Sequence, residues 1–231
     1  MTRPRLILAI TVGMVAGVVY ALMWVGYRQS WGWQHALDWS LLDTAHRVGV
    51  QHPLWVRFFG SVSFALGPVL RVLGAAAAVY AALKRKLRAA LVLVCCAPLS
   101  GFVTLAAKSL VNRPRPSTML TYEPSTSFPS GHSLEGTAAM LALLVFALPA
   151  LSRPAARIAT GVVALGVLSV GVARVCLNVH YPSDVLAGWS LGYLLFLLCL
   201  LAFRPSLIAQ GARLRTGPDA ISTTSSALGA R

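Results

Sequence analysis

The stretch VLAGWSLGYLLFLLCLLAF, residues 185–203, runs for 19 residues without a charged side chain. A helix of that length crosses the hydrocarbon core of a bilayer, which is about 30 Å thick. Similar runs occupy 6–27, 58–82, 89–109, 133–151 and 157–177. The run at 6–27 is longer than the apolar part of a signal peptide, so we expect it to be retained. The sequence therefore predicts an all-α, polytopic membrane domain, residues 1–205, built as a bundle of six transmembrane helices.

The composition excludes an ordinary soluble domain. Of the 231 residues, 57% are hydrophobic and 11% are charged, and the mean hydropathy is +0.71, whereas soluble domains carry about 25% charged residues. The formal net charge of +14 does not predict a nucleic-acid partner, because basic residues of membrane proteins are distributed by loop. Four cysteines fit small buried hydrophobes, with no zinc-like spacing: Cys95, Cys96, Cys176 and Cys199.

Two segments differ from the apolar runs. Residues 33–49, WQHALDWSLLDTAHRVG, have amphipathic helical spacing and several tryptophans, which predicts an interfacial helix between the first two spans. The C-terminal residues, 206–231, are more polar and end in ISTTSSALGAR. We expect them to form a disordered cytoplasmic tail.

The distribution of Lys and Arg predicts the orientation of the chain in a cell membrane. Loops 28–57, 108–132 and 174–184 are poorer in these residues and are expected on the outer face. Both termini are expected in the cytoplasm, together with the richer set: Arg3, Arg5, Lys84, Arg85, Lys86, Arg88, Arg153, Arg157 and the arginines of the tail. The bias toward Ala, Val, Gly, Leu and Arg is typical of a bacterial genome rich in G and C.

Three polar segments reach the outer face in this topology. They are KSLVNRPRP at 108–116, PSGH at 129–132 and RVCLNVHYPSD at 174–184. Together they supply cations for a phosphate group and backbone N–H groups at the start of a helix. Either histidine alone fits an interfacial or capping residue, and the cations alone fit lipid anchors. Their conjunction predicts phosphoryl transfer.

The two histidines can divide the reaction between them. Asp184 follows His180 by four residues, so the carboxylate can orient the ring, on one helix face or across a junction where Pro182 starts a helix. This makes His180 the expected nucleophile and His132, near the start of the fourth span, the expected general acid. Arg113 is an extra cation beside the site.

The three segments resemble the signature of the type 2 phosphatidic acid phosphatase superfamily, K-x6-RP, PSGH and SR-x5-H-x3-D. The resemblance covers the third to the sixth span, with one departure: Ala173 stands where the family has serine. It implies a site without a metal ion or other cofactor, in which His180 is the nucleophile, Asp184 its orienting partner and His132 the acid. The residues implied to hold the phosphate are Lys108, Arg115, Arg174, Ser130 and Gly131.

The leading hypothesis is a lipid phosphatase that hydrolyses a phosphate or diphosphate monoester, with membrane lipids as its partners. Its substrates would be similar to undecaprenyl diphosphate, phosphatidic acid, phosphatidylglycerol phosphate or lipid A phosphates. The sequence leaves open a lipid phosphotransferase with the same intermediate, and it does not indicate an oligomeric state. For a non-catalytic lipid-binding or transport protein, we would expect several ionisable groups deep in the spans. In this sequence the interiors of the spans are nearly free of them apart from Arg71. A vanadium haloperoxidase is disfavoured because that branch is soluble.

Three further charged residues need an explanation. Arg71 lies near the middle of the second span, where an arginine is expected to snorkel or to have a structural partner. Beside it, the small residues 74–78 predict close helix packing. Glu123 and Glu135 flank the PSGH segment, where they would select the head group or shape the mouth of the site, although a charge at a helix start is the simpler interpretation for Glu135.

Overall fold

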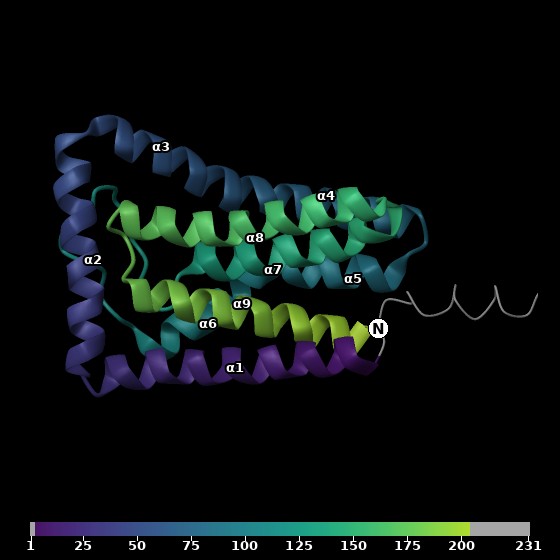
Figure 1. Cartoon of the computed structure of the whole chain (residues 1–231), viewed down its shortest axis with the longest axis horizontal. Coiled ribbons are helices and arrows are strands. Elements are labelled where there is room, and N and C mark those ends of the chain that lie inside the picture. Colours follow the sequence, from purple (N-terminus) through teal and green to yellow (C-terminus); the bar gives the residue numbers. More distant parts are fainter. Residues whose placement is uncertain (1–2, 204–231) are drawn as a thin grey trace, which may run out of the picture.

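The computed structural model describes residues 3–203, which form helices and connecting loops without a β-strand (Figure 1). The prediction of an all-α fold is confirmed, and the predicted tail at 206–231 lies outside the described residues. The elements are α1 Arg3–Arg28, α2 Gly32–Gln51, α3 Pro53–Phe64, the π-helical turn η1 Ala65–Val69, α4 Leu70–Leu83, α5 Leu87–Cys96, α6 Ser100–Val111, α7 Gly131–Ala147, the 3₁₀ turn η2 Leu148–Ala150, α8 Arg153–Cys176 and α9 Pro182–Phe203.

The predicted spans are confirmed as long apolar helical segments. Their largest shift is at the second span, which starts at Pro53 because proline suits the first turn of a helix. The six segments long and apolar enough to cross a membrane are Leu6–Arg28, Pro53–Leu83, Leu87–Val111, Gly131–Ala150, Arg153–Cys176 and Pro182–Phe203.

Two of the spans are interrupted. In the second span, η1 contains Pro68 and joins α3 to α4. In the third span, α5 ends at Cys96 and α6 begins at Ser100, with Pro98 between them. Proline cannot donate the backbone hydrogen bond of a continuous helix, so both interruptions have a local cause. Both also border the site described below.

Close backbone approach brings α7 and α9 together. A Cβ added at Gly188 in α9 would lie 2.6 Å from the carbonyl oxygen of Ser130, immediately before α7. Glycine is therefore needed where the start of α7 crosses α9. The predicted close packing of the small residues 74–78 is also confirmed, because a Cβ at Gly74 would collide with the Cβ of Ala97.

Helix α2 crosses one end of the bundle at a steep angle to the spans (Figure 1). This confirms the helix predicted between the first two spans. Its inward face is not purely apolar, because it buries Gln34 and Asp38 together with Leu42, Ala45 and Gly49. A buried carboxylate requires a partner, and that partner belongs to the site.

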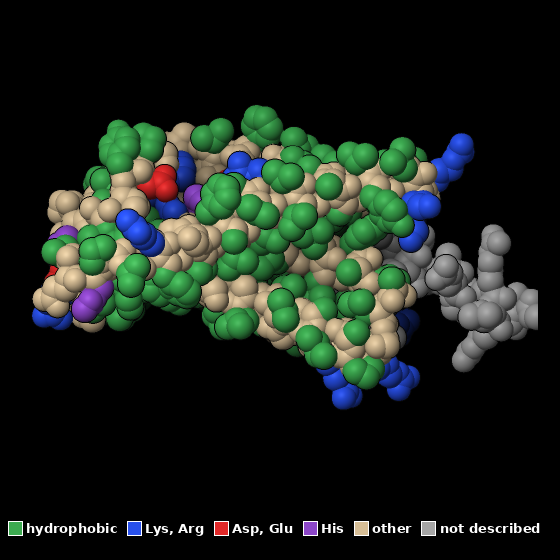
Figure 2. Space-filling model, turned by 90° about the horizontal axis from the view of Figure 1, so that it is seen from above, with side chains coloured by type: hydrophobic (Ala, Val, Ile, Leu, Met, Phe, Trp, Pro, Cys, Tyr) green, Lys and Arg blue, Asp and Glu red, His purple; other side chains and the backbone are tan. Residues whose placement is uncertain are grey.

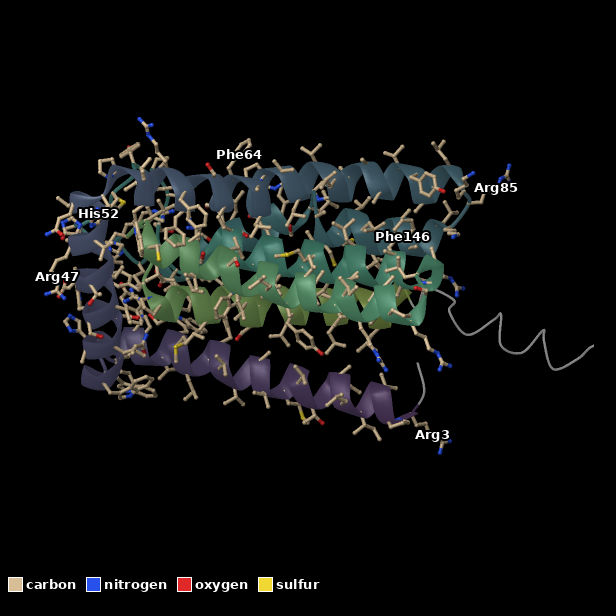
Figure 3. All side chains as sticks on the ribbon, turned by 45° about the horizontal axis from the view of Figure 1, so that its top comes forward. Arg3, Arg47, His52, Phe64, Arg85 and Phe146 are labelled. Atoms are coloured by element: carbon tan, nitrogen blue, oxygen red, sulfur yellow. The ribbon has the colours of Figure 1, made fainter. Side chains whose placement is uncertain are left out.

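The loop that precedes α7 and the start of α9 lie at the same end as α2 (Figure 1). Side chains labelled in Figure 3 mark the two ends: Arg47 and His52 lie at the α2 end, and Arg3 and Arg85 lie at the opposite end. The fold therefore brings the three polar segments together at the α2 end.

Candidate active site

A cavity of about 400 Å³ opens near the α2 end, within the size range of small-molecule sites. Figure 2 shows basic, acidic and histidine side chains gathered in a hollow on an otherwise hydrophobic face. The cavity is lined by Arg71, Pro98, Gly101, Phe102, Thr104, Leu105, Lys108, Arg115, Glu123, Ser125, Gly131, His132, Glu135 and His180.

Two of the cations predicted to hold a phosphate, Lys108 and Arg115, line this cavity, and Arg174 lies directly behind its wall in contact with Glu123. Lys108 comes from the last turn of α6, and its ammonium group donates to the Thr126 carbonyl. Arg115 follows in the loop, where its Nε donates to the Ser125 carbonyl oxygen at 2.6 Å. Arg174 comes from the last turn of α8. Basic side chains from three separate segments thus lie close together, and their combined positive charge favours an anionic ligand.

A carboxylate of the chain already contacts this cluster. Glu123 Oε1 accepts a hydrogen bond from Arg174 Nη2 at 2.6 Å, and Glu123 Oε2 lies 3.9 Å from Arg115 Nη2. Burial alone would raise the pKa of Glu123, but the hydrogen bond and the charges of the two arginines outweigh it and lower the pKa below its ordinary value. The cluster therefore stabilises an anionic oxygen at this position.

His180 has two distinct sides. Its Nδ1 lies 3.5 Å from Asp184 Oδ2, and its Nε2 lies 3.2 Å from Arg115 Nη1 at the cavity. Because α9 begins at Pro182, the pair spans a loop-to-helix junction, one of the two arrangements expected. This geometry places the orienting carboxylate on the Nδ1 side and leaves Nε2 facing the cations.

The His180 ring is 1% exposed. Burial first, and then the charges of Arg174, Arg115 and Lys108, lower the pKa of His180 well below its ordinary value of 6.5. The neutral ring keeps the lone pair that a nucleophile needs.

This pKa shift predicts the charge of His180 directly. At pH 6.5 an unperturbed imidazole is half protonated, whereas the His180 ring is expected to remain neutral. Nitrogen NMR of the full chain labelled at histidine measures this, with the signal assigned by its loss in His180→Gln. A His180 signal that is half shifted to the imidazolium position at pH 6.5 would contradict the prediction.

Asp184 is held by more partners than the sequence indicated. Its Oδ2 accepts hydrogen bonds from the Tyr181 backbone N–H at 2.9 Å and from the Ser127 hydroxyl. Its Oδ1 accepts from Arg113 Nη1 at 2.8 Å. Ser127 belongs to the hydroxyl-rich loop before PSGH, where neighbouring serines gave no signal to single it out.

The expectation that Arg113 adds a cation beside the phosphate is wrong. Arg113 is buried behind the site, with its guanidinium carbon 3.8 Å from the centre of the Tyr181 ring and 4.7 Å from that of Tyr27. Its Nη2 donates to Asp38 Oδ2 at 2.9 Å. Arg113 therefore joins the carboxylates of α2 and α9, and their charges balance its own.

Asp38 was not identified as a site residue from the sequence. Its Oδ1 accepts from the Ser183 backbone N–H at 2.9 Å, and its Oδ2 from the Ser183 hydroxyl at 2.6 Å, so α2 holds the first turn of α9. The chain has only six Asp and Glu residues, and a scarce carboxylate among tryptophans was a signal that could have found it. Within residues 3–203, four acidic side chains pair with arginine: Asp38, Glu123, Glu135 and Asp184.

The PSGH segment forms the start of α7, as predicted for His132. Ser130 is the N-cap, and α7 begins at Gly131. A Cβ at Gly131 would lie 2.9 Å from Thr104 Cγ2, and a Cβ at Gly67 of η1 would lie 2.5 Å from His132 Cδ2. The two glycines thus allow close contacts that fix the wall of the cavity and the position of the His132 ring.

The predicted site residues take three positions. Ser130 is buried and does not line the cavity, although the next residue, Gly131, does. Its Oγ accepts a hydrogen bond from Ser133 Oγ at 3.0 Å. Arg174 and Asp184 lie behind the wall, in contact with Glu123 and His180. Those that line the cavity are Lys108, Arg115, Gly131, His132 and His180. Within residues 3–203, no three His, Cys, Asp or Glu side chains form a group that could hold a metal ion.

The expectations for Arg71 and Glu135 are resolved together. Arg71 Nη2 forms an ion pair with Glu135 Oε2, so the arginine has a partner, which was one of the two expectations. The interpretation of Glu135 as a helix-start charge is wrong, because the first turn of α7 has no acidic residue and Glu135 faces Arg71 across the cavity wall.

These features define an integral membrane enzyme of phosphate chemistry. A model of the PAP2 superfamily matches residues 89–207. Among curated proteins, phosphatidylglycerophosphatase B of Bacillus subtilis is 35% identical over 147 residues, which are 62% of this chain and 70% of the relative. The crystal structure of a transmembrane PAP2-type phosphatidylglycerolphosphate phosphatase from Bacillus subtilis has a TM-score of 0.65 and 23% identity, and the match covers 90% of this chain and 97% of that one.

The chain belongs to the PAP2 superfamily. It is a membrane-bound phosphatase of lipid phosphates, as the three polar segments predicted.

Proposed function

We propose that the chain hydrolyses the terminal phosphate monoester of a lipid through a phospho-histidine at His180, and that phosphatidylglycerol phosphate is its substrate. The observation that carries this proposal is the orientation of His180. Its Nε2 meets Arg115 at the cavity, while Asp184 lies on its Nδ1 side. This arrangement is suited to a neutral imidazole that attacks phosphorus.

Binding of the phosphate uses the cation cluster. The phosphate replaces the Glu123 carboxylate as the anionic partner of Arg174 and accepts hydrogen bonds from Arg115 and Lys108. Arg174 has a further donor for it, because its buried Nε has no hydrogen-bond partner among the described residues. The backbone N–H groups at the start of α7 add the favourable end of a helix dipole.

The reaction then takes two steps. The lone pair of His180 Nε2 attacks phosphorus, the bond to the lipid oxygen breaks, and His132 gives its proton to that oxygen to release the alcohol. Asp184 stabilises the charge on the phosphorylated ring. Water next attacks phosphorus, His132 takes its proton, the N–P bond breaks, and inorganic phosphate leaves. Because the cations meet the phosphoryl oxygens throughout, their main contribution is charge stabilisation.

The choice of substrate is supported by the relatives. Phosphatidylglycerophosphatase B of Bacillus subtilis shares 35% identity with this chain. A site at the ends of spanning helices can also take a phosphorylated head group while the acyl chains stay in the bilayer.

Phosphate release from a panel of lipids in detergent tests this function. We expect release from phosphatidylglycerol phosphate, in the presence of EDTA, at a higher kcat/KM than from phosphatidic acid or undecaprenyl diphosphate. The control is the same panel with the His180→Ala protein. No release from any lipid, or equal release by the His180→Ala protein, would refute the proposed function.

We also propose that the active site faces the outside of the cell membrane. The ends of α1 and of the α4–α5 turn that carry Arg3 and Arg85 lie opposite the site (Figure 3), and the end richer in basic residues is retained in the cytoplasm. In intact cells, an impermeant maleimide is expected to label a cysteine at Arg47 and not one at Arg85, in a chain whose four native cysteines are replaced by alanine. Labelling of the Arg85 position alone would reverse the orientation.

A further inference from the structure

The Arg71–Glu135 pair lies in the wall of the catalytic cavity, not in the packed core. An arginine at the centre of a spanning helix costs about 2.5–3.5 kcal/mol on insertion scales, so it needs a compensating role. A structural pair would bury both partners, but the Arg71 side chain is 46% exposed whereas that of Glu135 is 11% exposed. Arg71 therefore presents a charged group to whatever enters the cavity.

Arg71 also has free donor capacity. A guanidinium carries five N–H donors, and among residues 3–203 the recorded hydrogen bond of this side chain is the one from Nη2 to Glu135 Oε2. Glu135 is fixed on its other side by Thr104, whose Oγ1 donates to Glu135 Oε1 at 2.9 Å. The carboxylate is thus anchored between α4 and α6, and the arginine keeps donors for a ligand.

The pair lies one helical turn from the expected acid, on both walls of the cavity. Along α7, Glu135 follows His132 by three residues, which places the two on the same face. Along η1 and α4, Arg71 follows Gly67 by four residues, and Gly67 packs against the His132 ring. One turn advances about 5.4 Å. That rise matches the three-carbon glycerol unit that separates a terminal phosphate from the next phosphate group in a lipid.

Part of the cavity wall is apolar. Phe102 and Leu105 of α6 line the same cavity and are 69% and 64% exposed. The cavity therefore combines cations and histidines, a second polar group of Arg71, Glu135 and Thr104, and exposed apolar side chains. These are the kinds of group needed to bind a lipid whose terminal phosphate is joined to its acyl chains through a second polar unit.

We propose that Arg71, Glu135 and Thr104 form a second polar subsite, which binds the glycerol hydroxyl and the phosphodiester of the head group. The hydroxyl donates to Glu135, and the diester oxygens accept from the free N–H groups of Arg71. Phosphatidic acid has neither group at this distance from its phosphate, so the subsite selects the longer head group. The assignment rests on the proposed function, because it takes the reacting phosphate to be at His180.

The test compares kcat/KM on dioctanoyl phosphatidylglycerol phosphate and dioctanoyl phosphatidic acid, which have the same chains, in detergent with the full-length protein. Arg71→Met is expected to lower kcat/KM by about 10–100-fold on the first lipid, as for loss of a charged hydrogen bond, and by less than about 3-fold on the second. Thr104→Val removes only the hydroxyl that holds Glu135, and it is expected to give a smaller loss that again falls mainly on phosphatidylglycerol phosphate. Arg57→Met, an exposed arginine of the same span, is the matched control and is expected to change neither value.

Each outcome decides between the subsite and the function on which it rests. Equal losses on the two lipids, or no loss on either, would mean that the pair is structural only and would overturn the subsite while leaving the phosphatase intact. If Arg71→Met does not fold, Arg71→Glu combined with Glu135→Arg keeps the ion pair, and Thr104→Val keeps both charges; unchanged selectivity in both would overturn the subsite. A wild-type protein inactive on both lipids would refute the proposed function and the subsite with it.

Discussion

Replacing His180 with asparagine is expected to lower kcat on a lipid phosphate by about 10⁴-fold or more, as for loss of a covalent nucleophile. The His180 Nε2 atom faces the cation cluster, and the other ring nitrogen, Nδ1, faces the buried carboxylate of Asp184. Asparagine keeps a polar side chain of similar reach but cannot form an N–P bond. Steady-state phosphate release measures the loss.

The covalent step has a signature of its own. Lipid labelled with ³²P at the terminal phosphate is expected to label the wild-type protein in a rapid quench, with an acid-labile and base-stable bond. The His180→Asn protein is expected to remain unlabelled. Labelling that persists in this variant would move the nucleophile to another residue.

The matched control is His132→Asn, which tests the acid separately. Loss of a general acid is expected to cost about 10²–10⁴-fold on an alkyl phosphate. The cost is expected to be much smaller on an aryl phosphate, whose leaving oxygen needs no proton. If His132→Asn were equally impaired on both substrates, the division of roles between the two histidines would be wrong.

The spans and the three polar segments could be predicted from the sequence because their signals are local. An uncharged run of 19 residues at 185–203 fixes a spanning helix by length alone, and PSGH carries its glycine and histidine side by side. The pairing of His180 with Asp184 follows from a spacing of four residues. Each of these inferences depends on residues within one turn or one loop.

The remaining contacts join residues that are distant in the chain. Arg71 and Glu135 are 64 positions apart, and Asp38 and Arg113 are 75 apart. Which carboxylate an arginine meets depends on the rotation and crossing of helices, and these are set by close contacts such as that of Gly188 with the Ser130 carbonyl. A hydropathy profile does not show how far each helix is rotated about its axis. The prediction therefore placed Arg113 beside the phosphate, whereas packing turns it toward α2.

Asp38 gives the second large expected effect, although it lies on a helix outside the spans. Asp38→Ala removes a carboxylate that accepts from Arg113 at 2.9 Å and from the Ser183 backbone N–H at 2.9 Å. Arg113 keeps Asp184 as its buried partner, so the loss comes from the buried donors of Arg113 and Ser183 that no longer have an acceptor, about 1–3 kcal/mol each. We expect a lower melting temperature in detergent and, because the first turn of α9 loses its anchor, a fall in kcat of about 10²-fold, as for a small misplacement of a catalytic group.

Two variants separate positioning from stability. Asp38→Asn keeps the shape and one acceptor oxygen, and it is expected to recover most of the melting temperature but only part of kcat, because the amide NH2 group cannot accept from either Arg113 or the Ser183 N–H. Asp43→Ala, the other acidic residue of α2, forms no ion pair among the described residues and is expected to change neither value. KM should stay within about 3-fold throughout, because Asp38 lies behind His180 and Asp184 and does not line the cavity. A rise in KM with unchanged kcat would place Asp38 in substrate binding and would refute a role through α9.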